Sequence, residues 1–229
     1  EFSASTTGDD VEYVEFFGSP NTDYSAYTLL GIEGDFNAST SDEGFVDNII
    51  PLGTTDANGF YLVNLAANAL ENGTISFLLV KDNTAVIGSD IDTDDDGVID
   101  VTFWSEITDG VAVNDGGTGD RTYATPVLGV AYDGFNFAPG GASRIPNGVD
   151  TDAISDWVRN DFDLAGISGY TGTIVTGEAY NTPGAVNQVY VETAPSVVST
   201  NPANGGNHPN DENITITFSE PVTVTDPWF

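Results

Sequence analysis

Residues Val11–Phe17, which read VEYVEFF, give the clearest indication of how this chain folds. Valine, tyrosine and phenylalanine are interleaved with glutamate, a pattern typical of a strand with one buried and one exposed face. The segment therefore predicts a β-strand that packs against an apolar core.

Similar short runs recur along the chain, and turn-forming pairs such as Asn58-Gly59 and Asn72-Gly73 separate them. Only Leu65–Leu70, as a single turn, and Thr151–Asn160 have a helical pattern. Regular short strands broken by Gly, Asn and Asp predict an all-β chain folded as an antiparallel sandwich or barrel. The further strands that we predict are Ala26–Glu33, Phe45–Ile50, Gly59–Asn64, Thr74–Lys81, Ile107–Val113, Pro126–Ala131, Gly172–Gly177 and Gln188–Glu192.

A domain boundary is expected near Val191–Pro195. It separates a main domain, residues 9–192, from a C-terminal segment, residues 193–229. The short segment has strand patterns at Ser196–Thr200, Asn213–Phe218 and Val222–Thr225, which are too few to bury a core of their own. We expect it to be the start of a truncated further domain. The chain contains no methionine, so we expect a fragment of a longer protein, in which Glu1-Phe2 is compatible with a cloning remnant.

The run from Asp92 to Asp100, DTDDDGVID, places carboxylates at relative positions 1, 3, 5 and 9 and glycine at position 6. Calcium takes six to eight oxygen ligands, and a tight loop supplies them from alternate residues around such a glycine. The run therefore predicts a Ca²⁺ site. Position 12 is Phe103 rather than glutamate, so we expect Asp90 to complete the site. The predicted metal ligands are Asp90, Asp92, Asp94, Asp96, the carbonyl of Val98, and Asp100.

Other readings of the acidic residues stay open. The Asp92–Asp100 run could be a solvated acidic turn without a metal. Asp115–Asp120 (DGGTGD) has part of a calcium-binding repeat, but nothing repeats and a surface turn is favoured. The aspartates around Thr151–Asn160 form either a second calcium site or a plain acidic face.

The charge of the chain restricts its partners. With 36 acidic and 4 basic residues the formal net charge is −32, which repels nucleic acid and attracts cations. We expect no direct nucleic-acid binding. Such acidity indicates an environment rich in salt or divalent cations, such as seawater, although halophilic adaptation gives the same composition.

Catalytic residues are not evident. The chain lacks cysteine, and its single histidine, His208, lies in a loop of the C-terminal segment. Nucleophile–histidine arrangements are therefore not expected, and we predict no catalytic residues. Arg144 and Arg159 are expected to form structural ion pairs, and Trp104 and Trp157 either pack in the core or stack on a ligand.

Several motifs, in their order along the chain, resemble the lamin tail domain. VEYVEFFGSPNTDYSAYTL (residues 11–29) is similar to its first two strands, and GFYLVNL (59–65) to its central strand. ASRIPNG (142–148) and TPGAVN (182–187) are similar to two of its loops. The resemblance covers residues 10–188 and implies an Ig-like antiparallel β-sandwich with long loop insertions.

The C-terminal segment, from Ala194 to Val224, resembles the first strands of a bacterial Ig-like domain. Lamin tail domains with such insertions are similar to those of large secreted bacterial proteins, among them extracellular nucleases of the endonuclease/exonuclease/phosphatase type. These resemblances imply an accessory or targeting module, because they bring no reactive residue with them.

We therefore expect a non-catalytic, calcium-stabilised module of a secreted or surface-bound bacterial protein from a saline environment. The alternatives are a recognition module that binds a glycan or a partner protein, and a structural or adhesive module of the cell envelope. Besides calcium, an extracellular polymer or a protein is the expected kind of partner. No apolar run is long enough for membrane insertion.

Overall fold

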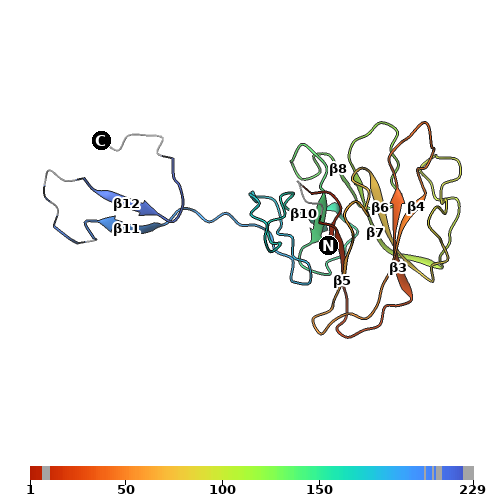
Figure 1. The fold of residues 1–229 in the computed structure, drawn as a ribbon, viewed down its shortest axis with the longest axis horizontal. Coiled ribbons are helices and arrows are strands. Elements are labelled where there is room, and N and C mark those ends of the chain that lie inside the picture. Colours follow the sequence, from red (N-terminus) through yellow and green to blue (C-terminus); the bar gives the residue numbers. More distant parts are fainter. Residues whose placement is uncertain (7–10, 204, 208, 210–212, 224–229) are drawn as a thin grey trace. The chain divides into compact units, whose positions relative to one another are not determined.

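The computed structural model describes residues 1–6, 11–203, 205–207, 209 and 213–223. The chain divides into two compact units, Glu1–Tyr190 and Val191–Phe229 (Figure 1). Both are built from strands, and the described residues contain only one short 3-10 helix, η1 (Ile154–Asp156). No helix among them is long and apolar enough to span a membrane. His208 lies outside the described residues, as does the end of the strand predicted at Val222–Thr225.

The first unit is a sandwich of two five-stranded sheets, as the all-β, Ig-like prediction requires. One sheet has the order β10-β9-β1-β2-β5, with all its strand pairs antiparallel. Its strands are β1 (Phe2–Ser3), β2 (Tyr13–Phe17), β5 (Phe60–Asn64), β9 (Gly141–Arg144) and β10 (Trp157–Arg159).

The other sheet has the order β4-β3-β6-β7-β8 and is antiparallel except for the parallel pair β7 and β8. The two central strands, β3 and β6, pair along seven residues each. The strands of this sheet are β3 (Tyr27–Glu33), β4 (Val46–Pro51), β6 (Ile75–Lys81), β7 (Glu106–Asn114) and β8 (Val127–Gly129).

The second sheet is buried on both faces. Successive side chains of a strand point to opposite faces, and β3 buries Leu29 on one face and Leu30 on the other. Leu29 belongs to the core between the two sheets, together with Phe2 and Val14 of the first sheet. Leu30 belongs to a second core, which Ile91 and Tyr123 complete from loop segments. The central strands of this sheet therefore consist of nearly continuous apolar residues, rather than of apolar residues that alternate with polar ones.

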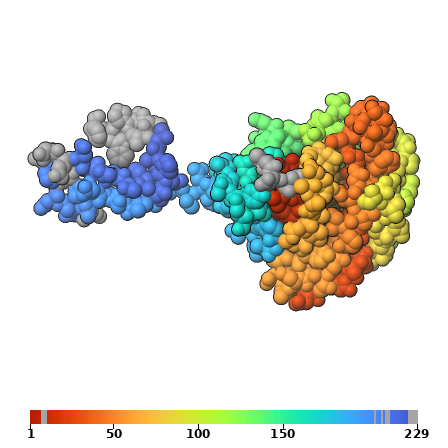
Figure 2. All heavy atoms as spheres, viewed as in Figure 1, coloured from red at the N-terminus to blue at the C-terminus, as the bar shows by residue number. Residues whose placement is uncertain are grey.

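Two insertions cover the outer face of the second sheet. The segment between β6 and β7 includes Ile91, which is fully buried, and the segment between β7 and β8 includes Tyr123. The first insertion lies beside β4, because the Val46 N–H donates to the carbonyl of Ser89 over 2.9 Å. In Figures 1 and 2 this stretch is the yellow to yellow-green chain at the edge of the unit. The insertions thus replace a third layer of regular structure.

Three local predictions are wrong. Thr151–Asn160 forms the single turn η1 and then strand β10, because Trp157–Arg159 pairs with Ala142–Arg144 of β9 and cannot also be helical. Gly172–Gly177 forms no strand, and near Gln188–Glu192 the structure has only an isolated bridge from Val189 to Ala179.

The N-terminal residues belong to the first unit. The sequence predicts a main domain that begins at residue 9, whereas strand β1 places Glu1-Phe2 within the fold as well. Phe2 is only 4% exposed and contacts Phe77, and its strand β1 lies between β2 and β9. A strand of two residues is too short for a sequence pattern to reveal it, although β1 pairs with both β2 and β9.

The second unit contains one described strand pair. β11 (Val197–Asn201) and β12 (Thr215–Phe218) are antiparallel. They correspond to the strands predicted at Ser196–Thr200 and Asn213–Phe218.

Candidate functional site

The acidic loop Asp92–Asp100 is anchored by Asp92, whose side chain is fully buried. One of its oxygens accepts a hydrogen bond from the Gly97 N–H over 2.7 Å, and the other accepts from the Asp96 N–H over 3.2 Å. Gly97 has a φ of 90°, which a residue with a Cβ rarely adopts. The loop therefore closes around its first carboxylate, and the glycine is necessary for that closure.

A residue from a distant insertion also binds Asp92. The Tyr123 hydroxyl donates to Asp92 Oδ2 over 2.9 Å. Burial raises the pKa of Tyr123 strongly, and the hydrogen bond to Asp92 raises it further. The tyrosine is therefore a neutral donor at physiological pH, and it ties the loop to the second core.

Two more carboxylates of the loop converge on Asp92. Oxygens of Asp92, Asp94 and Asp100 all lie within 4.8 Å of one another. Because calcium lies about 2.3–2.6 Å from each ligand oxygen, one ion can contact three oxygens at such separations. The pKa of Asp94 is raised, chiefly by the negative charge of Asp96. A cation would relieve this repulsion.

The other predicted ligands lie outside this group of three. Asp90 accepts the N–H of Asp92 over 2.9 Å, and Asp96 accepts the N–H of Val98 over 2.8 Å. Each of these hydrogen bonds joins a side chain to the backbone two residues further on, and so closes a turn within the loop. The full set of Asp90, Asp92, Asp94, Asp96, Val98 and Asp100 remains a prediction, and the geometry groups only half of it.

A buried glutamate that no sequence motif singles out adjoins the loop. Glu43 is 2% exposed, and its Oε2 has no hydrogen-bond partner. The next residue, Gly44, packs so closely that a Cβ there would lie 2.8 Å from Cβ of Asp92. The negative charge of Glu43 contributes to the raised pKa of Tyr123. A buried carboxylate oxygen without a donor is costly, so this neighbourhood favours a cation.

A second acidic group forms around Thr74. Oxygens of Asp35, Asp115 and Asp120 lie within 4.8 Å of one another. The Thr74 hydroxyl lies 2.7 Å from Asp120 Oδ2, and the Thr74 N–H donates to Asp35 over 2.7 Å. The DGGTGD segment therefore forms a surface turn that is joined to a distant aspartate. The aspartates around η1 form no such group among the described residues. Asp156 accepts the Thr151 N–H, and Asp161 accepts the Ala165 N–H.

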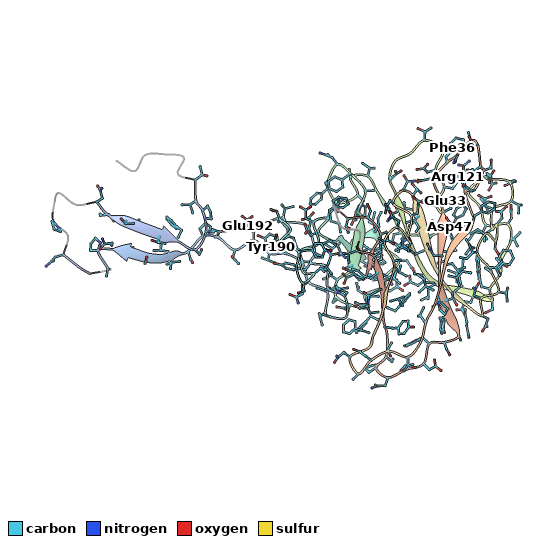
Figure 3. All side chains as sticks on the ribbon, in the orientation of Figure 1. Glu33, Phe36, Asp47, Arg121, Tyr190 and Glu192 are labelled. Atoms are coloured by element: carbon cyan, nitrogen blue, oxygen red, sulfur yellow. The ribbon has the colours of Figure 1, made fainter. Side chains whose placement is uncertain are left out.

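The second sheet carries two carboxyl groups with raised pKa values, one on β3 and one on β4. Burial raises the pKa of Glu33 to about 8, against the lowering effect of the Asp35 N–H, and the charges of Glu71 and Asp47 raise it further. The pKa of Asp47 is also raised, chiefly by burial. Figure 3 shows Glu33 and Asp47 on the same part of the unit. Crowded carboxylates thus destabilise the fold when they ionise.

The predicted ion pairs of the two arginines are confirmed. Arg144 binds both oxygens of Asp109, over 2.6 and 2.8 Å, and also contacts Asp150. Arg159 is 1% exposed and binds Asp133 over 2.5 and 2.8 Å. Their charges are therefore neutralised within the fold.

Comparison with known proteins gives one match. The family model of the bacterial Ig-like domain matches residues 191–228. No curated protein and no solved structure matches the chain. The match confirms the predicted resemblance of the C-terminal segment and indicates an accessory or cell-envelope module of a bacterial protein.

Proposed function

We propose that the first unit is a non-catalytic, calcium-stabilised accessory or targeting module of a secreted bacterial multidomain protein. The observation that supports this most directly is the group formed by Asp92, Asp94 and Asp100. Its central carboxylate is buried and hydrogen-bonded to Tyr123 of the second core. A calcium ion held there would fix both insertions on the outer face of the second sheet.

The size of the effect follows from mass action. Calcium at 100 times its Kd stabilises the folded state by about 2.7 kcal/mol. For a chain of this length, this corresponds to a rise in Tm of roughly 5–10 °C. Seawater-like, millimolar calcium would keep such a site filled if its Kd lies in the micromolar range.

Thermal unfolding tests the calcium site. We expect Tm to rise by several degrees when EDTA is replaced by millimolar CaCl₂, and not when NaCl of equal ionic strength is added. The double variant Asp94→Asn/Asp100→Asn should abolish the calcium-specific rise. The control Glu106→Gln/Asp163→Asn removes two exposed acids elsewhere and should retain it. An equal rise with NaCl, or in both double variants, would instead indicate general screening of the −32 charge.

The accessory role has its own test. Ordered motifs between residues 10 and 188 resemble a lamin tail domain, and the parent that we propose is an extracellular nuclease with a separate catalytic domain. The purified chain should therefore hydrolyse neither DNA nor simple phosphoesters, with or without calcium. Turnover that persists through purification would contradict a non-catalytic module.

The family match also favours a second candidate, a structural module of the cell envelope, since bacterial Ig-like domains occur in surface proteins. In the full-length gene, tandem Ig-like repeats without a catalytic domain would favour this candidate over the nuclease accessory.

A further inference from the structure

A pocket of about 150 Å³ lies between the two sheets of the first unit, where Arg144 of β9 binds Asp109 of β7. Since one water needs about 10–15 Å³ by this measure, the pocket has room for on the order of ten waters or a small ligand group. Its apolar wall includes Phe2, Phe77 and Leu79. A largely apolar pocket with a few polar groups is the usual form of a small-ligand site.

Two N–H donors on residues that line this pocket lack a partner. Arg144 Nε and Trp157 Nε1 are both buried and make no hydrogen bond. The two groups are adjacent, because the Arg144 guanidinium lies 4.8 Å from the centre of the Trp157 ring. Buried donors are almost always satisfied in folded proteins, so an acceptor group that enters the pocket could pair with these two.

The remaining polar groups of the pocket restrict the ligand. Asp109 and Asp150 already neutralise the Arg144 guanidinium, and Glu15 adds a further carboxyl group to the lining. Glu1 also lines the pocket and brings an N-terminal ammonium together with its own carboxylate, so no positive charge is left over to hold an anionic ligand. A purely apolar ligand would leave both donors unpaired. The pocket favours a neutral group that combines a carbonyl acceptor with a small apolar part.

An aromatic ring extends the pocket toward solvent. Phe17 lines it and is 46% exposed. An aromatic face carries partial negative charge and attracts polarised C–H groups such as those of a sugar ring. A ligand with a neutral acetamide-like group inside the pocket could therefore place a ring on Phe17.

We propose that this pocket binds the acetamido group of an N-acetylated sugar. The carbonyl oxygen would accept from Arg144 Nε and Trp157 Nε1, and the methyl group would lie against Phe2 and Phe77. The amide N–H would donate to a carboxylate of the lining, Asp109 or Glu15. Because both donor nitrogens are covered by protein, the Arg144–Trp157 pair must shift slightly when the ligand enters. This role goes beyond calcium stabilisation and does not require it.

The test is a titration of the full chain with N-acetylglucosamine, with glucose as the matched sugar that lacks the acetamido group. Two-dimensional ¹H–¹⁵N NMR follows the indole N–H resonance of Trp157. We expect this resonance to move with N-acetylglucosamine, with a Kd on the order of 1 mM, as ligand-size limits predict for a monosaccharide. Glucose should bind at least tenfold more weakly.

The variant Trp157→Phe keeps an aromatic ring but removes the donor, and it should weaken binding at least fivefold. Trp104→Phe, which alters the second core, should leave the affinity unchanged. The proposal is overturned if glucose and N-acetylglucosamine bind equally, if neither moves the Trp157 resonance, or if Trp157→Phe binds normally. Tighter binding of N-acetyl-lysine methyl ester than of the sugar would show that the pocket reads an acetylated side chain instead.

Discussion

The Tyr123 hydroxyl donates to Asp92 Oδ2 over 2.9 Å, and this contact between residues 31 positions apart joins the two insertions on either side of β7. Both side chains are buried against the outer face of the second sheet. Asp92 closes the acidic loop, so the geometry of this loop depends on a residue that lies outside it.

Tyr123→Phe removes this hydrogen bond and leaves a buried carboxylate with one donor fewer. We expect the free energy of unfolding without calcium to fall by about 2 kcal/mol, the usual cost for a hydrogen bond to a charged group. Urea denaturation in EDTA measures it. Tyr170→Phe, at a partly exposed position, serves as the control and should change stability by much less. Equal effects of the two variants would mean that the contact contributes nothing.

Stability should fall as pH rises through the neutral range when calcium is absent. Burial raises the pKa of Glu33 to about 8 and that of Glu15 to about 7, whereas both are near 4.5 in the unfolded chain. The folded state therefore holds more protons than the unfolded state between pH 4.5 and 8, and it loses stability as these protons leave. At the acid end, hydrogen bonds lower the pKa of Asp56 and Asp156, which removes stability as the pH falls below about 4.

Tm measured in EDTA from pH 3 to 9 should therefore have its maximum near pH 4–5. Glu33→Gln should flatten the decline between pH 4.5 and 8, while Glu106→Gln at an exposed position should not. A Tm that rises steadily from pH 5 to 8 would contradict the raised pKa values.

Phe2→Ala should destabilise the first unit by about 3–5 kcal/mol, the usual cost of truncating a buried phenylalanine. The ring contacts Phe77 and Trp157, with centroids at 5.0 and 5.9 Å. Phe36→Ala removes a ring that is 53% exposed and should cost far less in the same chemical denaturation experiment. If Phe2→Ala were as mild as Phe36→Ala, strand β1 would not be a part of the folded core.

Asp133→Asn should destabilise the protein by about 3 kcal/mol, because it leaves the buried Arg159 guanidinium without its countercharge. Arg159 also lies over the rings of Phe135 and Phe137, at 4.2 and 4.7 Å from their centres. Asp163→Asn, an exposed acid, is the matched control. Calorimetric unfolding of the two variants should separate them clearly, and similar midpoints would argue against a stabilising pair.

The sequence predicted those parts of the fold that depend on local patterns. The runs at Ala26–Glu33 and Thr74–Lys81 became the central strands β3 and β6 because apolar residues, some of them β-branched or aromatic, dominate them. The helix predicted at Thr151–Asn160 failed because tertiary pairing with β9 determined its conformation. Strand β1, only two residues long, has no periodicity to read.

The same distinction applies to the candidate site. Asp92, Asp94 and Asp100 come from one loop, and their spacing was sufficient to place them together. The fold brings three further residues to the acidic groups from distant segments of the chain. Tyr123 and Glu43 lie near Asp92, and Asp35 lies near Asp115 and Asp120. Nothing in the residues flanking these three indicates where the chain will carry them, so their roles require the three-dimensional structure.

The scarcity of basic residues has a consequence for how readily proteases can digest the protein. Proteases that cleave after lysine or arginine find only four sites in the whole chain. Lys81 ends a paired central strand, and Arg144 and Arg159 are held in strands by ion pairs. Arg121 donates to the carbonyl of Asp95. Because cleavage requires an accessible, extended backbone, trypsin-like enzymes could cut after the three strand residues only when the unit unfolds, and resistance to digestion at these sites would report on its conformational stability.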